Sequence, residues 1–306
     1  MSKPLPDLRE VHGLIVIGKI AAPSAIICSM LHPPAGPGAL LHHSGTTMQT
    51  YPVAVLAGFS TEHPDPLAVA MGRQRKALLE INGRPMVQWV VSALRRSPRV
   101  GRIAIVGVGP DDGIDFGPNV IYVPNMSRQF DNALAGVHAL QEVEPDLDYM
   151  LVCSGDIPLL KPESVDWFVD AAEAKKVDFV YSIVRKEIME GQFPGAARSY
   201  VWMREGQFCG GDLFLVRAMV ASNNEDLVRK LIERRKSAFQ QMRLAGFGTV
   251  IKFVLRRLTL PDAEAVATRL LGCQARTLDA PYADLGMDVD KPHQLEMVRR
   301  LLGAQA

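Results

Sequence analysis

The first residues that could do chemistry follow a short apolar run. This run, residues 53–57, ends just before Gly58, and a later segment supplies three cations, Arg73, Arg75 and Lys76. A glycine in such a loop lets backbone amides approach a base or a phosphate, and the cations suit a triphosphate. The segment is not a P-loop and not a dinucleotide fingerprint, because GxxxxGK[ST] and GxGxxG are both absent. Taken alone, this signal is weak.

A single acid forms the second candidate group. The segment 152–160 reads Val-Cys-Ser-Gly-Asp-Ile-Pro-Leu-Leu, so an apolar strand would deliver Asp156 at its carboxyl end. A carboxylate placed there can hold Mg²⁺, which binds through one or two protein carboxylates plus phosphate oxygens. The alternative is a helix cap, but Asp156 stands too far ahead of the helix expected at Pro162 to act as a simple one.

A second acidic segment precedes the last helix. Residues 288–292 read Asp-Val-Asp-Lys-Pro, and Asp290 could supply the second metal ligand. Asp290 would also make a good N-cap, with Pro292 in the first turn of the helix. One residue can do both.

The elements that must position these groups alternate between strand and helix. We expect strands at 53–57, 102–108, 120–123, 149–153 and 179–184, and helices at 86–94, at 130–140, from Pro162 and at 295–302. This alternation predicts an α/β fold with a mostly parallel sheet and helices on both faces. No internal repeat is seen.

The pattern changes after residue 198. Residues 199–203 and 213–216 read as strands around a tight turn that contains Gly206 and the Gly210–Gly211 pair. Residues 225–267 read as a basic, mainly helical insertion, whose charges are more typical of a solvated helix face than of a binding site.

The composition is that of an ordinary globular protein. The chain has 306 residues, 48% of them hydrophobic, and a net charge of +1. Such a small charge gives no strong field to recruit nucleic acid or an anionic membrane, so neither is expected as a partner. The four cysteines are widely spaced and form no CxxC pair, which favours buried thiols in a cytoplasmic protein over a disulfide framework or a zinc site. They are Cys28, Cys153, Cys209 and Cys273.

Residues 1–50 differ from the rest of the chain in being rich in proline and histidine. Within them, residues 14–31 are mostly apolar, which would suit a signal peptide or a membrane anchor. Lys19 interrupts that run, and no clean cleavage site follows. A disordered extension, or translated sequence upstream of a true start at Met48, is the favoured interpretation. The folded domain is expected at residues 51–302.

Five motifs in order resemble those of the MobA-like NTP transferase family. They are LAG, GRxRKALLxINGRPM, CSGDIPLL, GGDLFL and DVDKP. The resemblance covers about residues 51–302. It implies the Rossmann-like GT-A nucleotidyltransferase fold, in a family that includes molybdenum cofactor guanylyl- and cytidylyltransferases and sugar-1-phosphate uridylyltransferases.

The resemblance also implies roles for individual residues. Leu56, Ala57 and Gly58 would contact the base and ribose, and Asn132 would be a polar residue near the nucleotide. Arg73 would bind the β- and γ-phosphates and Lys76 the α-phosphate. Asp156 and Asp290 would hold Mg²⁺, and Gly210, Gly211 and Asp212 would resemble a GGN-type turn that faces the acceptor.

Three features depart from the family pattern. Phe59 stands where a second glycine is usual, the loop 60–71 is long, and Asp212 replaces a commoner asparagine. The first two departures affect the expected phosphate geometry, and the third affects the acceptor contact.

The implied reaction joins the α-phosphate of an NTP to an oxygen of a small acceptor and releases pyrophosphate. Catalysis would depend on positioning and charge neutralisation, supplied by Lys76, Arg73 and Asp156, more than on a protein nucleophile. Two alternatives stay open. A GT-A glycosyltransferase would use Asp288 and Asp290 as a DxD motif, and a non-catalytic nucleotide-binding module would have kept only the fold. Neither the base nor the acceptor nor the oligomeric state is specified by the sequence.

Overall fold

The computed structural model describes residues 48–218 and 247–304. The predicted N-terminal extension and the question of a start at Met48 concern residues 1–47, which lie outside the described residues, as does much of the predicted basic insertion. The rest of that insertion, α10 (Phe247–Val254) and α11 (Leu260–Leu271), is helical as predicted.

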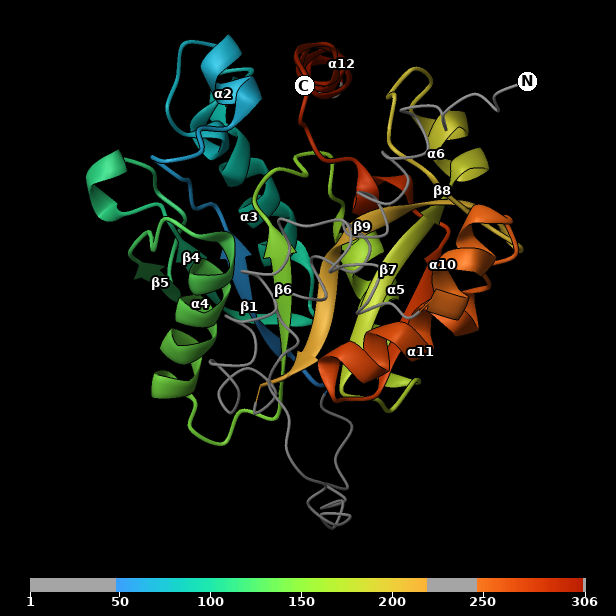
Figure 1. The fold of residues 1–306 in the computed structure, drawn as a ribbon. Coiled ribbons are helices and arrows are strands. Elements are labelled where there is room, and N and C mark those ends of the chain that lie inside the picture. The colour runs from blue at the N-terminus through green and yellow to red at the C-terminus, as the bar shows by residue number, and fades with distance from the viewer. Residues whose placement is uncertain (1–47, 219–246, 305–306) are drawn as a thin grey trace.

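A mixed sheet runs through the centre of the molecule (Figure 1). Its seven-strand path has the order β10-β7-β9-β6-β1-β4-β5, and β8 pairs with β9 at one side. On this path only β9 is antiparallel to its neighbours, and the other pairings are parallel. The strands are β1 (Tyr51–Leu56), β4 (Val100–Val106), β5 (Val120–Val123), β6 (Tyr149–Ser154), β7 (Phe179–Arg185), β8 (Val201–Met203), β9 (Gly206–Arg217) and β10 (Ala275–Ala280).

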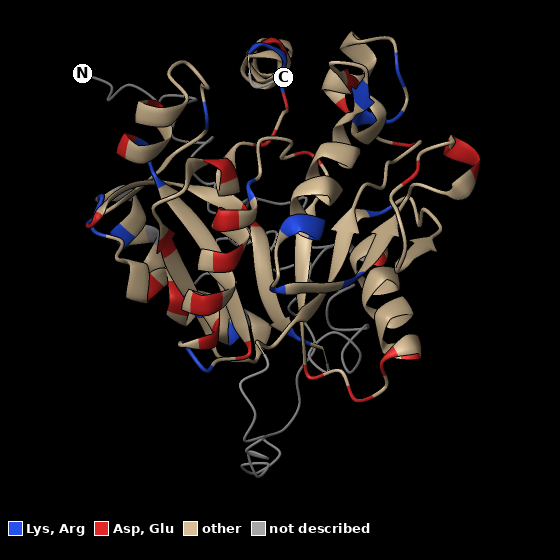
Figure 2. Cartoon of the chain, turned by 180° about the vertical axis from the view of Figure 1, so that it is seen from behind, with Lys and Arg blue, Asp and Glu red and all other residues tan. Residues whose placement is uncertain are grey.

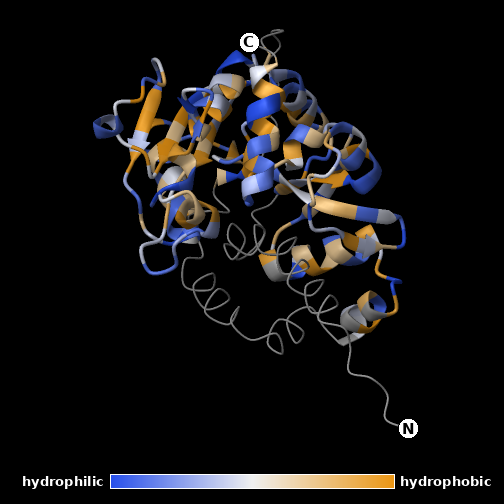
Figure 3. Cartoon of the chain, turned by 90° about the horizontal axis from the view of Figure 1, so that it is seen from above, coloured by the Kyte–Doolittle hydropathy of each residue, from blue (hydrophilic) through white to orange (hydrophobic). Residues whose placement is uncertain are grey.

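Helices cover both faces of this sheet, as the alternation predicted. α3 (Met86–Arg96) and α5 (Pro162–Glu173) pack into the core on one face, and α4 (Gln129–Val143) and α11 into the core on the other (Figure 1). Seen from above, the strands are largely hydrophobic, while polar residues colour much of the helices (Figure 3). The remaining elements are α2 (Pro66–Ala70), η1 (Lys76–Leu78), the hairpin β2 (Glu80–Ile81) and β3 (Arg84–Pro85), η2 (Pro110–Asp112), α6 (Lys186–Gln192), η4 (Ala283–Gly286) and α12 (Pro292–Gly303).

The alternating side chains of β1 explain how its two faces pack. Val53 and Val55 belong to one core, and Ala54 belongs to the other, since successive side chains of a strand point to opposite faces. A Cβ atom at Gly136 of α4 would lie 2.9 Å from the Cβ of Ala54. The two small residues therefore let α4 approach β1 closely.

The prediction of a turn at Gly210–Gly211 is wrong. Both glycines lie inside β9, and the turn between β8 and β9 instead ends at Gly206, whose φ is +142°. A Cβ at Gly210 would lie 1.9 Å from the Tyr181 hydroxyl, and one at Gly211 would lie 2.0 Å from Ser182 Oγ. The glycine pair makes room for side chains of β7 and does not bend the chain.

Charge and burial agree with the composition. Lys and Arg lie scattered among Asp and Glu over the back of the molecule (Figure 2). Three cysteines, Cys153, Cys209 and Cys273, are buried free thiols, which confirms the core interpretation for them; Cys28 lies outside the described residues. None of the helices in residues 48–218 and 247–304 is both long and apolar enough to cross a bilayer.

Candidate active site

The carboxyl ends of β1 and β6 meet where the strand order reverses. β1 pairs with β4 on one side and with β6 on the other, and the chain visits β4 and β5 before it returns to β6. Ligands of open α/β sheets bind in the crevice at such a switch point. The backbone N–H of Gly155 donates to the carbonyl of Leu56 at 2.9 Å, so the loops after the two strands are joined directly.

Glycines let these loops pack backbone against backbone. A Cβ at Gly107, after β4, would lie 2.4 Å from the Cα of Gly58, and Gly107 has a φ of +90°. A Cβ at Gly155 would lie 2.9 Å from the carbonyl oxygen of Leu56. Gly58 itself is exposed while Ala57 is buried. The first loop therefore offers bare backbone to a ligand at the predicted nucleotide position.

Two asparagines hold this loop in place. Asn125 Oδ1 accepts the N–H of Phe59 at 3.0 Å, and Asn125 Nδ2 donates to the carbonyl of Phe59 at 2.9 Å. Asn132, in the first turn of α4, is buried and accepts the N–H of Met126 at 2.7 Å. A Cβ at Gly58 would lie 2.0 Å from Asn132 Nδ2. The structure thus places Asn132 directly against the Gly58 loop.

Arg75 differs from the other two cations of its segment. Its guanidinium binds both carboxylate oxygens of Asp112, at 2.5 and 2.9 Å, and the carbonyl of Gly107 at 2.6 Å. It also lies over the ring of Phe59, 5.3 Å from the centroid. In this structure the Arg75 side chain fixes the loops, and the expectation that it serves a triphosphate stays a prediction. Phe59, the departure from the family pattern, supplies the ring on which it stacks.

Lys76 lies at the centre of the acidic residues. Its ammonium nitrogen is 2.6 Å from Asp156 Oδ2, 2.7 Å from Asp290 Oδ1 and 3.7 Å from Asp65 Oδ2. Burial alone would lower the pKa of Lys76, but the carboxylates of Asp156 and Asp290 outweigh it and raise the pKa above its usual value. Lys76 is therefore a permanent cation that joins three segments far apart in the sequence.

The two acidic loops are also joined through their backbones. The N–H of Val289 donates to the carbonyl of Asp156 at 3.0 Å. The N-cap of α12 is Lys291 and not Asp290, so the alternative of an Asp290 cap is wrong. Gln294 instead reaches back and accepts the N–H groups of both residues, at 2.8 and 2.9 Å. The Asp290 carboxylate is thereby left to interact with Lys76.

Next to this cluster, Asp212 on β9 and Arg198, which precedes β8, are incompletely hydrogen-bonded. Arg198 forms an ion pair with Asp288, yet Arg198 Nε is buried without a hydrogen bond. Asp212 Oδ2 is likewise buried without a partner. Burial, together with the charge of Asp156, raises the pKa of Asp212 to about 7. Asp212 therefore lies near the acidic cluster, although it is part of a strand and not of the expected turn.

Sequence and structure comparisons agree on the family. The MobA-like NTP transferase domain matches residues 67–243. The chain belongs to this family. It is 34% identical to a hypothetical transferase from Thermus thermophilus, with a TM-score of 0.69 over 81% of this chain and 100% of the other. No curated protein matches it.

More distant structures share the nucleotidyltransferase fold of this family. One is CMP:2-keto-3-deoxy-manno-octonic acid synthetase in complex with CTP, with 16% identity and a TM-score of 0.50 over 84% of this chain and all of that one. Another is 4-diphosphocytidyl-2C-methyl-D-erythritol synthase, with 14% identity and a TM-score of 0.51 over the same shares. The predicted fold class is thereby confirmed.

By themselves, the side chains of this MobA-like chain supply only part of the coordination of a magnesium ion. No group of three or more His, Cys, Asp or Glu side chains in the described ranges could hold a metal. Asp156 and Asp290 are brought together by one ammonium, however, and two carboxylates are the usual protein share of a magnesium site that phosphate oxygens complete. The site therefore suits Mg²⁺ that arrives with a nucleotide.

Some members of this MobA-like site were not predicted from the sequence. Ser154 Oγ donates to Asp156 Oδ1 at 2.5 Å and orients that carboxylate. Asp65 both caps α2 and approaches Lys76. The Asp65-Pro66 pair is a recognisable helix start, so this element could have been found. Arg73, in contrast, is exposed, and its side chain forms no ion pair with Asp65, Asp156 or Asp290.

Proposed function

We propose that this protein transfers a nucleoside monophosphate from an NTP to a small-molecule acceptor and releases pyrophosphate, in a reaction that requires Mg²⁺. The observation that carries this proposal is Lys76, held between Asp156 and Asp290 at the switch point of the sheet. A partly buried, permanently charged ammonium beside two carboxylates is suited to bind a metal-bound phosphate chain.

The nucleotide is proposed to lie over the loop of Leu56, Ala57 and Gly58. The exposed Gly58 allows the base and ribose to approach the backbone, and Asn132 supports the loop from below. Arg73 is exposed and follows Gly72, which has a φ of +66°, so its side chain is available to the β- and γ-phosphates.

Lys76 is proposed to stabilise the charge that develops on the α-phosphate while an acceptor oxygen attacks in line. Transfer at phosphorus needs this positioning and neutralisation more than a protein nucleophile. Asp156 and Asp290 would hold Mg²⁺, which would neutralise phosphate charge when bound. Ser154 keeps the Asp156 carboxylate in position through its hydrogen bond.

The acceptor is proposed to bind beside β9, where Gly210, Gly211 and Asp212 approach the same end of the sheet. The proposed acceptor is small and is neither nucleic acid nor membrane, because the net charge is only +1. The buried free thiols support a cytoplasmic location.

The test is a screen of the four NTPs against a broad panel of sugar phosphates and other phosphorylated or hydroxylated small molecules. Each pair is assayed with Mg²⁺ and with EDTA, and both pyrophosphate and nucleoside diphosphate are measured. Magnesium-dependent pyrophosphate release with one NTP and acceptor is the expected result. In a parallel set in which a nucleotide sugar replaces the NTP, release of nucleoside diphosphate would support the glycosyltransferase alternative. Tight NTP binding without turnover across the panel would support a binding module.

A further inference from the structure

The Lys76 ammonium contacts the same two carboxylates that are proposed to hold Mg²⁺. Its nitrogen is 2.6 Å from Asp156 Oδ2 and 2.7 Å from Asp290 Oδ1. The other oxygen of the Asp156 carboxylate, Oδ1, accepts the hydroxyl group of Ser154 at 2.5 Å. Both oxygens of Asp156 are therefore engaged by donors of this chain, and any cation that needs them must compete with Lys76.

The competition between this ammonium and a divalent cation is electrostatic. Magnesium binds carboxylate oxygens directly and tolerates little departure from its preferred geometry. A cation bound to the oxygens of Asp156 and Asp290 would lie beside the Lys76 ammonium, and like charges at such short range repel each other. We therefore expect these carboxylates to be held either by the ammonium or by a divalent cation.

The ammonium neutralises the acidic residues only in part. One positive charge lies between the two negative charges of Asp156 and Asp290, and Asp65 Oδ2 adds a third carboxylate at 3.7 Å. The side chains of Lys76 and Asp156 are only 16% and 17% exposed, so solvent and salt screen the remaining negative charge weakly. The carboxylates therefore still favour a doubly charged cation over a single ammonium.

Lys76 can leave the carboxylates by rotation of its side chain alone. The carbonyl of Lys76 accepts the N–H of Leu79 at 3.0 Å, and the preceding Arg75 is bound to Asp112, so the backbone here is held on both sides. The flexible four-carbon stem of a lysine lets its ammonium move while the backbone stays in place. The phosphate chain of an NTP would give the ammonium new anionic partners.

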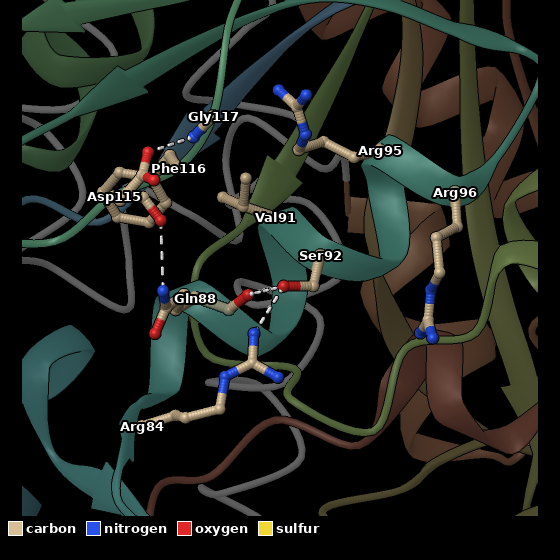
Figure 4. Close-up of a pocket in the computed structure, with 9 residues that line it drawn as sticks. All are labelled: Arg84, Gln88, Val91, Ser92, Arg95, Arg96, Asp115, Phe116 and Gly117. Carbon is tan, nitrogen blue, oxygen red and sulfur yellow. Dashed lines mark hydrogen bonds between the residues drawn. The ribbon is translucent and has the colours of Figure 1, made fainter.

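A second group of cations lies apart from this cluster and provides a control. Arg84, Arg95 and Arg96 line an open pocket beside α3, and Figure 4 shows their guanidinium groups spread around it. Arg95 lies in the last turn of α3, which leads into the amino end of β4, whereas Lys76 lies at the carboxyl ends of the strands. Among the residues that the structure describes, the pocket lining and the Lys76 cluster have none in common.

We propose that Lys76 holds Asp156 and Asp290 in place of a divalent cation in the ligand-free protein, and that it releases them when the phosphate chain of an NTP binds. The two carboxylates then accept a divalent cation together with the nucleotide and not before it. Lys76 thereby sets the order of binding, in addition to its proposed role at the α-phosphate. This inference rests on the proposed function for the identity of the phosphate ligand, but its test measures binding and not turnover.

Binding of Mn²⁺ without nucleotide, followed by electron paramagnetic resonance of the free ion, tests the competition on the full chain. Mn²⁺ accepts the same oxygen ligands as Mg²⁺. Wild type should bind it weakly, and Lys76→Met should bind it about tenfold or more tightly than wild type, because both carboxylates are released. The double variant Lys76→Met/Asp156→Asn should lose this gain. Arg95→Gln, which removes the same charge elsewhere, should bind like wild type.

Melting temperatures test the release of Lys76 by a nucleotide. Each of the four NTPs is added with and without Mg²⁺, and NaCl at matched ionic strength is the salt control. For at least one NTP, wild type should be stabilised far more by Mg²⁺ and the nucleotide together than by either alone, since a ligand stabilises the state that binds it. Lys76→Met should already be stabilised by Mg²⁺ alone.

Three results would overturn the proposal. They are equal Mn²⁺ affinity of wild type and Lys76→Met, a gain that survives Asp156→Asn, and stabilisation of wild type by Mg²⁺ alone that no NTP increases. If Lys76→Met does not melt cooperatively, Lys76→Gln replaces it with the same expectations, because its neutral amide can still donate to a carboxylate. If the binding results hold while no acceptor supports pyrophosphate release, the transferase proposal fails and the competition stands.

Discussion

The two sides of the crevice at the sheet's carboxyl end are built differently. On the β1 side, Asn125 and the Arg75–Asp112 pair are hydrogen-bonded to the backbone of neighbouring loops. On the β9 side, Asp212 and Arg198 keep buried polar atoms without a hydrogen bond. Lys76, with Asp156 and Asp290, lies between these two sides.

This difference indicates how the two substrates would be accommodated. A loop fixed by its own hydrogen bonds presents the same backbone to every nucleotide, which suits a substrate shared across a family. Buried polar atoms without partners cost free energy and persist where a ligand completes their bonding. The β9 side is therefore where we expect the acceptor to make specific contacts.

The largest expected effect comes from the residues between the two sides. Asp156→Ala should lower kcat by roughly a hundredfold or more, the scale measured for a central electrostatic group. Steady-state pyrophosphate release with a cognate NTP and acceptor measures it. Asp111→Ala, which removes an exposed acid from η2, is the control and should behave like wild type. Near wild-type turnover in Asp156→Ala would remove this residue from the site.

A single added methyl group should displace the hydrogen-bonded loop on the β1 side. In Gly58→Ala the new Cβ would lie 2.0 Å from Asn132 Nδ2, so the loop or the asparagine must move. We expect the KM for the NTP to rise about tenfold, with a smaller change in kcat, because ground-state binding is lost. Gly109→Ala is the matched control, since its Cβ would meet nothing within 4 Å. Equal KM values for the two variants would show that the loop is not held as described.

The β9 side can be tested through its stability. Burial raises the pKa of Asp212 to about 7, so ionisation of its carboxyl group destabilises the native state. The penalty begins above the pKa of the unfolded chain, near 4, and grows until pH passes about 7. Asp212→Asn should therefore raise the melting temperature by about 2–4 °C at pH 8 in EDTA, and by less at pH 5.

Asp111→Asn provides the baseline for that comparison, because Asp111 is exposed. A gain for Asp212→Asn that is the same at pH 5 and pH 8 would mean that Asp212 titrates normally. A loss of stability at both pH values would mean that its carboxylate is bonded in the folded protein.

The smallest effect is expected from a segment to which none of the residues named on the two sides of the crevice belongs. Deletion of residues 1–47 should change the free energy of unfolding by less than about 0.5 kcal/mol and leave turnover unchanged, because their proline-rich sequence has no periodic apolar pattern. Chemical denaturation and pyrophosphate release measure the two quantities. A much lower melting temperature or aggregation would show that this segment packs on the domain.

The strands that hold the site were predictable because each is a strongly apolar run. β6, for example, is buried along four consecutive residues and delivers Asp156 at its end as predicted. β10 was missed because Arg276 and Asp279 break its apolar pattern at the edge of the sheet. The glycine pair of β9 was misread as a turn because its cause, the side chains of Tyr181 and Ser182, lies on another strand.

The candidate site was predictable in its members more than in its contacts. Lys76, Asp156 and Asp290 come from motifs that the sequence displays, and the structure brings all three together. The pairing of Arg75 with Asp112 was not predictable, because neighbouring cations look alike in sequence and only the fold decides which one meets an acid.

The central claim is that Lys76 acts on the α-phosphate during transfer, and steady-state pyrophosphate release by wild type, Lys76→Ala and Lys76→Arg tests it most directly. An interaction that strengthens in the transition state should, when lost, lower both kcat and kcat/KM, and Lys76→Ala should lose on the order of a hundredfold in each. Lys76→Arg should not restore full activity, because a planar guanidinium places its charge differently from a compact ammonium. Melting temperatures measured with Mg²⁺ show that the variants are folded. A folded Lys76→Ala variant with unchanged kcat, whether or not its KM for the NTP rises, would contradict the claim.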